Sequence, residues 1–231
     1  MFRRLLSGAV AVVPTGLAAA DRVTATVVAG LVADRIRTQE ALPTSPTVTI
    51  GGFPFLTQAL CGTYSDVRVT VAELRRGSVA LTDLTAHLHG VRVPLVSVLR
   101  GSVRDVPVDD ADAKALLTYA DLTAALPAER LSLSEQDGRV RLHGSVMVFG
   151  QRLAGSAVGE VRVEGNRLTI IPHNITLDVG PTSLALGPAY AAALTYSTTL
   201  TLPFGLRLGE VAIQPDGLRL SASGQGLVLG R

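Results

Sequence analysis

The stretch Arg130–Pro172 reads RLSLSEQDGRVRLHGSVMVFGQRLAGSAVGEVRVEGNRLTIIP, and most of its apolar residues alternate with polar ones. Three short glycine-containing pairs interrupt the alternation at roughly regular spacing: Asp137-Gly138, Gly150-Gln151 and Gly165-Asn166. Such pairs are typical of tight turns between antiparallel strands. The stretch therefore predicts a meander of strands, each with one buried face.

The same period of two extends to both sides of the meander. Upstream, strands are expected at Thr47–Ile50, Val67–Val71, Val79–Leu88 and Val91–Leu95, followed by a loop bracketed by Gly101 and Pro107. The alternation changes phase near Asp83, which indicates a bulge or a sharp bend. Downstream, the expected elements are a strand at Ile175–Val179, a helix within Tyr190–Leu194, strands at Leu206–Leu208 and Val211–Ile213, and a hairpin through Pro215-Asp216-Gly217 to Leu218–Leu220.

Helical spacing occurs near the start of the chain. The apolar residues of Asp21–Leu42 recur every three or four positions, which predicts one long amphipathic helix that Pro43 and Pro46 end. A short helix within Leu56–Leu60 is expected, closed by Gly62.

Two interpretations of residues 110–126 remain open. One is a strand over Ala113–Tyr119 followed by a short helix, Asp121–Leu126, and the other is a continuous helix, Asp110–Leu126. The elements together predict an α+β fold with an antiparallel sheet.

Composition narrows the class of protein. Charged residues make up 17% of the 231 residues, where about 25% is usual, and 47% are apolar. This balance excludes an intrinsically disordered chain and calls for membrane contact or an apolar ligand. The net charge is +2, and without residues 1–20, which contain Arg3 and Arg4 and no acidic residue, it is zero. We therefore expect no nucleic-acid partner.

Residues 1–20 have the pattern of an export signal. A basic start precedes the apolar stretch Leu5–Ala20, and Ala18-Ala19-Ala20 offers the small residues of a cleavage site before Asp21. The apolar stretch is short for a membrane span, which needs about 20 residues. A cleaved signal, an uncleaved N-terminal anchor and a buried helix all fit this pattern. The first two predict an exported protein.

Catalytic and metal-binding motifs are absent from the sequence. It contains no G-x-S-x-G, H-E-x-x-H or phosphate-binding G-x-x-x-x-G-K-[ST] pattern. His87 and His89 share one face of a predicted strand, but no third metal ligand lies nearby, and the single Cys61 has no adjacent base. We therefore expect no enzyme, no cofactor and no metal site.

Several phrases of the sequence, in this order, carry a likeness to a known family. They are Gly52-Phe53-Pro54-Phe55-Leu56-Thr57-Gln58, Gly62-Thr63-Tyr64-Ser65-Asp66-Val67, Gly90-Val91-Arg92-Val93-Pro94-Leu95, Tyr119-Ala120-Asp121-Leu122, Leu202-Pro203-Phe204-Gly205-Leu206-Arg207-Leu208 and Pro215-Asp216-Gly217-Leu218. Through them the chain from Asp21 onward resembles the actinobacterial LmeA-like phospholipid-binding proteins.

The resemblance implies a fold similar to the tubular lipid-binding proteins, in which a long helix packs on a highly curved antiparallel sheet, a half barrel. It implies one lipid-binding domain, residues 21–231, in the periplasm or cell envelope, with phospholipid or a related envelope lipid and the membrane surface as partners. Lipid transfer and a role in envelope lipoglycan maturation follow as expectations. The residues expected at the lipid site are Phe53, Phe55, Leu56, Leu60, Tyr64, Tyr119, Leu122, Phe149, Tyr190 and Phe204. The alternatives are a non-catalytic structural or assembly partner in the envelope and an enzyme acting on envelope lipids.

Overall fold

The computed structural model describes residues 9–76, 79–103, 105–125, 131–148, 151–200, 202 and 205–229. Within this part, the chain divides into two compact units. The first unit contains the described residues of 1–71, 85–112 and 224–231. The second contains those of 72–84 and 113–223. Predicted site residues Phe149 and Phe204 lie outside the described residues.

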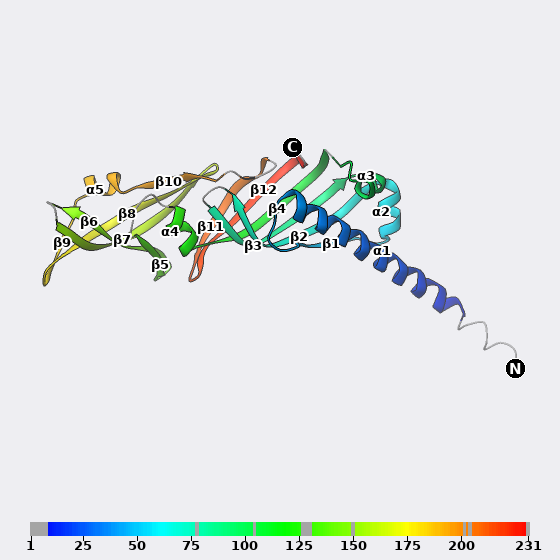
Figure 1. The fold of residues 1–231 in the computed structure, drawn as a ribbon, viewed down its shortest axis with the longest axis horizontal. Coiled ribbons are helices and arrows are strands. Elements are labelled where there is room, and N and C mark those ends of the chain that lie inside the picture. The colour runs from blue at the N-terminus through cyan, green and yellow to red at the C-terminus, as the bar shows by residue number, and fades with distance from the viewer. Residues whose placement is uncertain are drawn as a thin grey trace. The chain divides into compact units, whose positions relative to one another are not determined.

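The described residues form five helices (Figure 1). They are α1 (Ala9–Gln39), α2 (Phe55–Cys61), α3 (Leu95–Arg100), α4 (Tyr119–Ala125) and α5 (Pro188–Ala193). The long helix expected from Asp21 is confirmed, but it begins earlier and passes Ala20 without a break. Ala18, Ala19 and Ala20 are strong helix formers, so they propagate the helix toward its N-terminus. The short helix before Gly62 is also confirmed, with Gly62 as a left-handed C-cap at φ 66°.

The strands form two antiparallel sheets that do not close into a barrel (Figure 1). They are β1 (Thr47–Ile50), β2 (Thr63–Arg76), β3 (Val79–Arg92), β4 (Val106–Thr118), β5 (Ser132–Gln136), β6 (Arg139–Val148), β7 (Gln151–Glu164), β8 (Arg167–Val179), β9 (Thr182–Ala185), β10 (Tyr196–Thr199), β11 (Arg207–Gln214) and β12 (Gly217–Leu229). The first sheet has the order β1-β2-β3-β4-β12-β11, and the second has the order β10-β8-β7-β6-β5, with β9 also on β8. The α+β class is confirmed, and the strands divide between two sheets.

The meander predicted over residues 130–172 is confirmed as β5 to β8. Asp137 and Gly138 have φ values of 56° and 72°, the positive pair that a two-residue hairpin turn requires. The register pairs Val140 with Gly159 and Leu142 with Ala157, so the alternation turns Val140 and Leu142 to the same face. Both side chains are buried, as the sequence pattern predicts.

Two predicted elements between β3 and β4 are wrong. The strand expected to continue to Leu95 ends at Arg92, and Leu95–Arg100 forms helix α3. Pro94 lacks the N–H that would extend the ladder, and it occupies the N-cap of α3. The loop expected to reach Pro107 is also shorter, because β4 begins at Val106. A short apolar run such as Leu95–Leu99 fits a helix or a strand, so periodicity alone does not separate them.

Other ambiguous segments are resolved by the structure. The bend expected near Asp83 coincides with a positive φ of 50° at that residue, inside β3. Residues 106–118 form a strand and the short helix α4 follows, so the continuous helix Asp110–Leu126 is wrong. Ile175–Val179 is not a separate strand but the end of β8, past the irregular Asn174 at φ 49°. Helix α5 confirms the helical prediction around Tyr190.

In the first unit, α1 packs against β1 and α2 through one face. The buried residues of this face are Asp21, Ala25, Val28, Ala29 and Ala33, spaced three or four apart. All but Asp21 are small or apolar, which allows close approach of the helix. The opposite face of α1 exposes Val23, Val27 and Leu31. An amphipathic helix of a soluble domain normally carries polar residues there.

Candidate functional site

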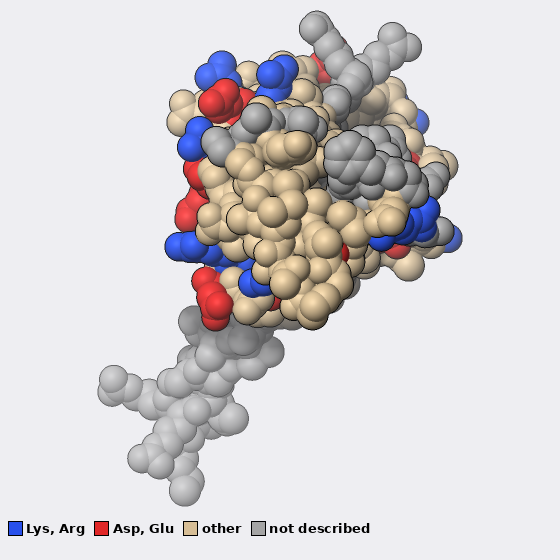
Figure 2. Space-filling view, turned by 90° about the vertical axis from the view of Figure 1, so that its left-hand side faces the viewer, with Lys and Arg blue, Asp and Glu red and all other residues tan. Residues whose placement is uncertain are grey.

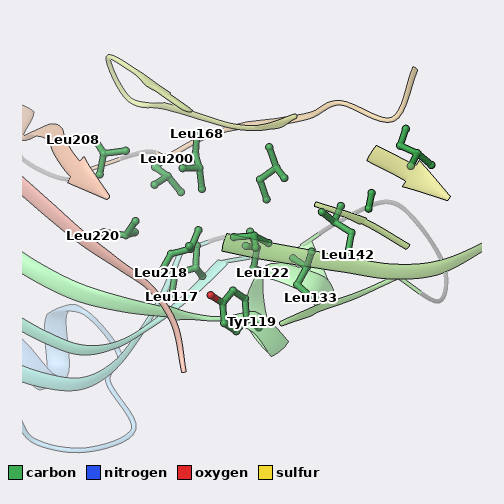
Figure 3. Close-up of a cluster of buried hydrophobic side chains, with 14 residues drawn as sticks. Leu117, Tyr119, Leu122, Leu133, Leu142, Leu168, Leu200, Leu208, Leu218 and Leu220 are labelled. Atoms are coloured by element: carbon green, nitrogen blue, oxygen red, sulfur yellow. The ribbon is translucent and has the colours of Figure 1, made fainter. Parts of the chain in front are cut away.

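The second unit contains a buried apolar cluster, which we call the interior cluster (Figure 3). Its members are Leu117, Tyr119, Leu122, Leu133, Val140, Leu142, Ala157, Leu168, Ile170, Ile175, Leu200, Leu208, Leu218 and Leu220. They come from both sheets and from α4. In Figure 3, Leu168 and Leu200 face Leu117, Leu122 and Leu218 from the opposite side. The second unit therefore has an apolar interior between two layers.

The margin of the interior cluster is only partly covered. Ten further hydrophobic residues pack against it while remaining partly exposed: Val79, Leu81, Leu131, Val161, Val163, Leu186, Ala191, Leu202, Val211 and Ile213. They lie at the boundary between the fully buried leucines and solvent. The interior cluster therefore has a partly exposed apolar edge, in a fold whose sheets do not close into a barrel.

Helix α4 holds Tyr119 and Leu122 in the interior cluster. The Thr118 hydroxyl accepts a hydrogen bond from the Asp121 N–H at 3.1 Å and donates one to the Asp121 carboxylate at 2.6 Å, which fixes the first turn. The Tyr119 hydroxyl donates to the Gln214 carbonyl at 2.9 Å. Burial, with the nearby charges of Glu135 and Asp216, raises the pKa of Tyr119 to about 12. The tyrosine is therefore neutral and anchored, with its ring against the leucines.

The first unit exposes a second apolar region, on two short helices. Its members are Phe53, Leu56, Leu60, Val96 and Leu99, and we call it the α2–α3 surface. All five side chains are large and exposed, Leu60 to 89% and Phe53 to 67%. The two helices meet where the Val93 N–H donates to the Gly62 carbonyl at 2.8 Å. A Cβ on Gly62 would lie 3.3 Å from Pro94 Cα, so glycine permits this close approach.

A buried carboxylate holds α2 in place. No side chain within α2 or at its N-cap Pro54 satisfies the first N–H groups of the helix. Asp21 of α1 does so instead, because its two oxygens accept the N–H groups of Phe55 and Leu56 at 2.9 Å each. Burial raises the pKa of Asp21, but these two hydrogen bonds and the Arg22 guanidinium at 3.1 Å outweigh burial, and the net pKa is lowered. Asp21 is therefore an ionised cap supplied from another helix.

Of the ten residues expected at the lipid site, the eight that the structure describes fall into distinct places. Phe55 and Tyr64 are buried in the first unit, with ring centroids 6.1 Å apart, and burial raises the pKa of the Tyr64 hydroxyl. Phe53, Leu56 and Leu60 lie on the α2–α3 surface. Tyr119 and Leu122 belong to the interior cluster, and Tyr190 is exposed on α5. Each unit therefore brings part of the set together, and lipid contact by these residues stays a prediction.

Apart from Leu122, sequence reasoning did not name the leucines of the interior cluster as site candidates. Leu117, Leu168 and Leu218 are each at most 1% exposed and lie at its centre. Their signal was the strand alternation itself, which marks inward positions without separating a filled core from a ligand site. The role of Asp21 had no sequence signal, because its partners Phe55 and Leu56 lie far along the chain.

Two other surface features fit a lipid site less well than the interior cluster does. An open pocket of about 220 Å³ at the β5–β6 turn is lined by Gln136, Asp137, Arg139, Val140, Arg141 and Val158. It is smaller than the roughly 300–1,000 Å³ of typical small-molecule sites, and its lining is mostly polar. Figure 2 shows the face where α5 and β9 lie, with uncharged residues in the middle and charged ones around them. Its exposed large apolar residues include Val179, Leu184, Tyr190 and Leu194.

Comparison with known proteins identifies the family. No curated protein and no solved structure matches the chain. The profile of the LmeA-like phospholipid-binding family matches residues 19–223, which covers the whole second unit and the first unit except residues 1–18 and 224–231. The match begins two residues before Asp21 and so includes the α1–α2 contact. With an apolar interior between two unclosed sheets and a match of this length, the chain belongs to the LmeA-like phospholipid-binding family.

Proposed function

We propose that this protein carries a phospholipid in the cell envelope, with the acyl chains lying against the interior cluster of the second unit. The observation that supports the proposal is the combination of 14 buried apolar residues with ten partly exposed apolar neighbours, in a chain of a phospholipid-binding family. An acyl chain along the margin of the interior cluster would complete the burial of Val163 and Val211 and their neighbours.

The free energy available from acyl burial is large enough for stable binding. Each methylene removed from water contributes about 0.8 kcal/mol, so a chain of about fourteen carbons gains on the order of 10 kcal/mol before the costs of binding. Tyr119 offers no charge to a lipid, because its hydroxyl is neutral and bound to Gln214. The interior cluster would thus select for apolar chains, and the head group would stay outside it.

The cellular role that we propose follows from the N-terminal segment and the family. Residues 1–20 act as an export signal or an anchor, which places residues 21–231 in the periplasm or cell envelope. There the protein binds and transfers phospholipid without catalysis, and the lipid supply serves the maturation of envelope lipoglycans. The fold would be of the tubular lipid-binding type, and phospholipid would be its ligand.

A second candidate function is a structural or assembly partner in the envelope. The observation that favours it is the α2–α3 surface, where five large apolar side chains are exposed. Such a partner would bury this surface and would leave the interior cluster without lipid. The two functions therefore differ in what the purified protein contains.

Native mass spectrometry of the full chain purified from cells tests the proposal directly. Phospholipid should remain bound to the unaltered protein. Val163→Gln places an amide at the margin of the interior cluster and should lower the bound fraction severalfold. Arg162→Gln is the matched control, because Arg162 is the next residue of β7, points to the opposite face and binds Glu160 at 2.7 Å.

The outcomes separate the candidate functions. A protein that carries no phospholipid but co-purifies with an envelope protein would contradict lipid carriage and favour the assembly role. If Val163→Gln retains as much phospholipid as Arg162→Gln, the acyl chains do not lie against the interior cluster. Thermal melts of both variants establish that each is folded.

A further inference from the structure

We propose that the α2–α3 surface docks on the surface of an anionic phospholipid bilayer, with Phe53, Leu56, Leu60, Val96 and Leu99 entering its interface. This inference extends the proposed function, because a lipid carrier must meet a membrane to load or release its cargo. It concerns the first unit, whereas the proposed acyl site lies in the second. The two can therefore be tested separately.

These two short helices expose large apolar side chains, whereas ordinary packing leaves polar side chains on the exposed face of a helix. Single exposed hydrophobic residues are common on protein surfaces and need no explanation. Here, Leu56 and Leu60 occupy neighbouring positions of α2 while Phe55 and Ala59 of the same helix are buried. Both faces of α2 are thus apolar. Val96 and Leu99 repeat the exposed pattern on α3, which abuts α2 at Gly62.

Helix α1 holds both short helices rigidly. The Asp21 carboxylate accepts the Phe55 and Leu56 N–H groups at the start of α2, and the Arg35 guanidinium donates to the Leu99 carbonyl at the end of α3, at 3.2 Å. The two anchoring residues are about 21 Å apart along α1. These contacts satisfy backbone groups at the helix ends, so the α2–α3 surface can enter an apolar medium at lower desolvation cost. The exposed side chains are presented on a preorganised support.

The position of the N-terminal apolar segment points to a membrane as the occupant. Residues 5–20 carry no charged side chain, and they lead directly into Asp21, which binds α2. By length and composition alone, the stretch Gly16–Gln39 of α1 could cross a membrane, and 28% of its apolar 18-residue window is buried. A bilayer that receives the segment before Asp21 therefore lies beside the α2–α3 surface. A soluble protein partner would not explain this coincidence.

The charges around the α2–α3 surface match an anionic lipid head group. Residues 51–63 contain no charged side chain, and residues 93–103 contain only Arg100, which is exposed beside Leu99. The Arg22 guanidinium lies 5.6 Å from the centre of the Phe53 ring. The surface thus has an apolar centre with arginines at its rim, and residues 51–63 and 93–103 contain no acidic side chain. This composition is typical of an interfacial membrane-binding surface.

The single cysteine offers a local probe for the test. Cys61 is exposed at the end of α2, beside Leu60, and can be labelled with an environment-sensitive fluorophore in the full chain. Vesicles of phosphatidylglycerol and phosphatidylcholine, and vesicles of phosphatidylcholine alone, are then added. Fluorescence at Cys61 reports the environment beside Leu60, and variants of Val96 and Leu99, which keep the N-terminal segment, separate docking of this surface from association through that segment alone.

We expect the probe to enter an apolar environment with the anionic vesicles, and lipid-borne quenchers to reduce its emission. The double substitution Val96→Asp and Leu99→Asp should raise the vesicle concentration needed by at least tenfold. Leu184→Asp is the matched control, because Leu184 is 54% exposed, like Val96, but lies on β9 of the second unit. The milder pair Val96→Ser and Leu99→Ser keeps the test valid if the charged pair disturbs folding.

Three outcomes would overturn docking: a probe that stays in water with anionic vesicles, a response unchanged by the α3 substitutions, or a probe shift that appears without vesicles as protein concentration rises. The last outcome would identify a second copy of the chain as the occupant. Native mass spectrometry of the same variants keeps the two proposals distinct. Lost docking with normal phospholipid content leaves lipid carriage intact, whereas normal docking without bound phospholipid contradicts lipid carriage alone.

Discussion

The carboxylate of Asp21 accepts the backbone N–H of Phe55 at 2.9 Å, across 34 residues of sequence. This hydrogen bond joins the long helix to the first turn of α2 and replaces the missing side-chain cap at Pro54. It is formed by a charged group in an otherwise apolar contact between helices, where an unpaired partner would be costly. The position of α2 therefore depends on the ionisation of one side chain.

Acid should weaken this contact. The folded protein holds the pKa of Asp21 below its ordinary value of 3.8, so the carboxylate stabilises the fold above that value. The contribution is lost as the pH falls from about 3.8 through the folded pKa. We expect the melting temperature of Asp21→Asn to be lower than that of the unaltered protein at neutral pH and to change less on acidification below pH 4. Asp34→Asn, on the exposed side of the same helix, is the control. Equal acid dependence of both variants would contradict this role for Asp21.

Alkali should act on the second unit through Tyr119. Its pKa is raised from 10.0 to about 12, so the unfolded chain ionises first and stability is lost as the pH rises between these values. Tyr119→Phe should remove this part of the alkaline loss. It should also cost about 0.5–1.5 kcal/mol at neutral pH, through the hydrogen bond to Gln214. Denaturant unfolding across the alkaline range measures both effects. The exposed Tyr190→Phe should match the unaltered protein, and a similar change in both variants would refute the assignment.

Leu218 is the most completely buried leucine of β12, at 0% exposure. Leu218→Ala should destabilise the protein by about 2–5 kcal/mol, because it removes buried methylenes and leaves a cavity in the interior cluster. Val228→Ala, at a position of the same strand that is 41% exposed, should cost much less. Urea unfolding followed by circular dichroism gives both values. A small loss for Leu218→Ala would mean that the interior cluster is loosely packed.

Processing of the N-terminal segment can be tested by protein chemistry. Replacing Ala18 and Ala20 by large residues removes the small side chains that a signal peptidase needs. If residues 1–20 are a cleaved signal, the variant should accumulate as a longer, membrane-retained product. Mass spectrometry of the exported protein measures its length. A mature mass that the substitutions leave unchanged, or an unprocessed parent protein, would contradict the prediction.

The sequence predicted the strands better than it predicted helix α3 or the grouping of the candidate site residues. Strands from Ser132 to Pro172 were predictable because their period and their glycine turns are local signals. Helix α3 was not, because Leu95–Arg100 is too short for periodicity to separate a helix from a strand. The aromatic residues were proposed for the site because of their residue type, which does not show whether a side chain is buried or exposed. Their division into buried Phe55, exposed Phe53 and the interior Tyr119 depends on long-range contacts, such as those of Asp21 and Gln214.

If residues 1–20 are a cleaved export signal, the unbroken helix across Ala20 and Asp21 sets an order of events for export. A peptidase binds its substrate as an extended chain, but in the folded protein the bond after Ala20 lies in a helix, and the next side chain is 3% exposed. Cleavage there must therefore come before α1 docks on α2. Molecules that fold first would keep residues 1–20 and stay tethered, while those cut first would be released. The relative speed of folding and processing would then divide one gene product between a fixed and a diffusing population.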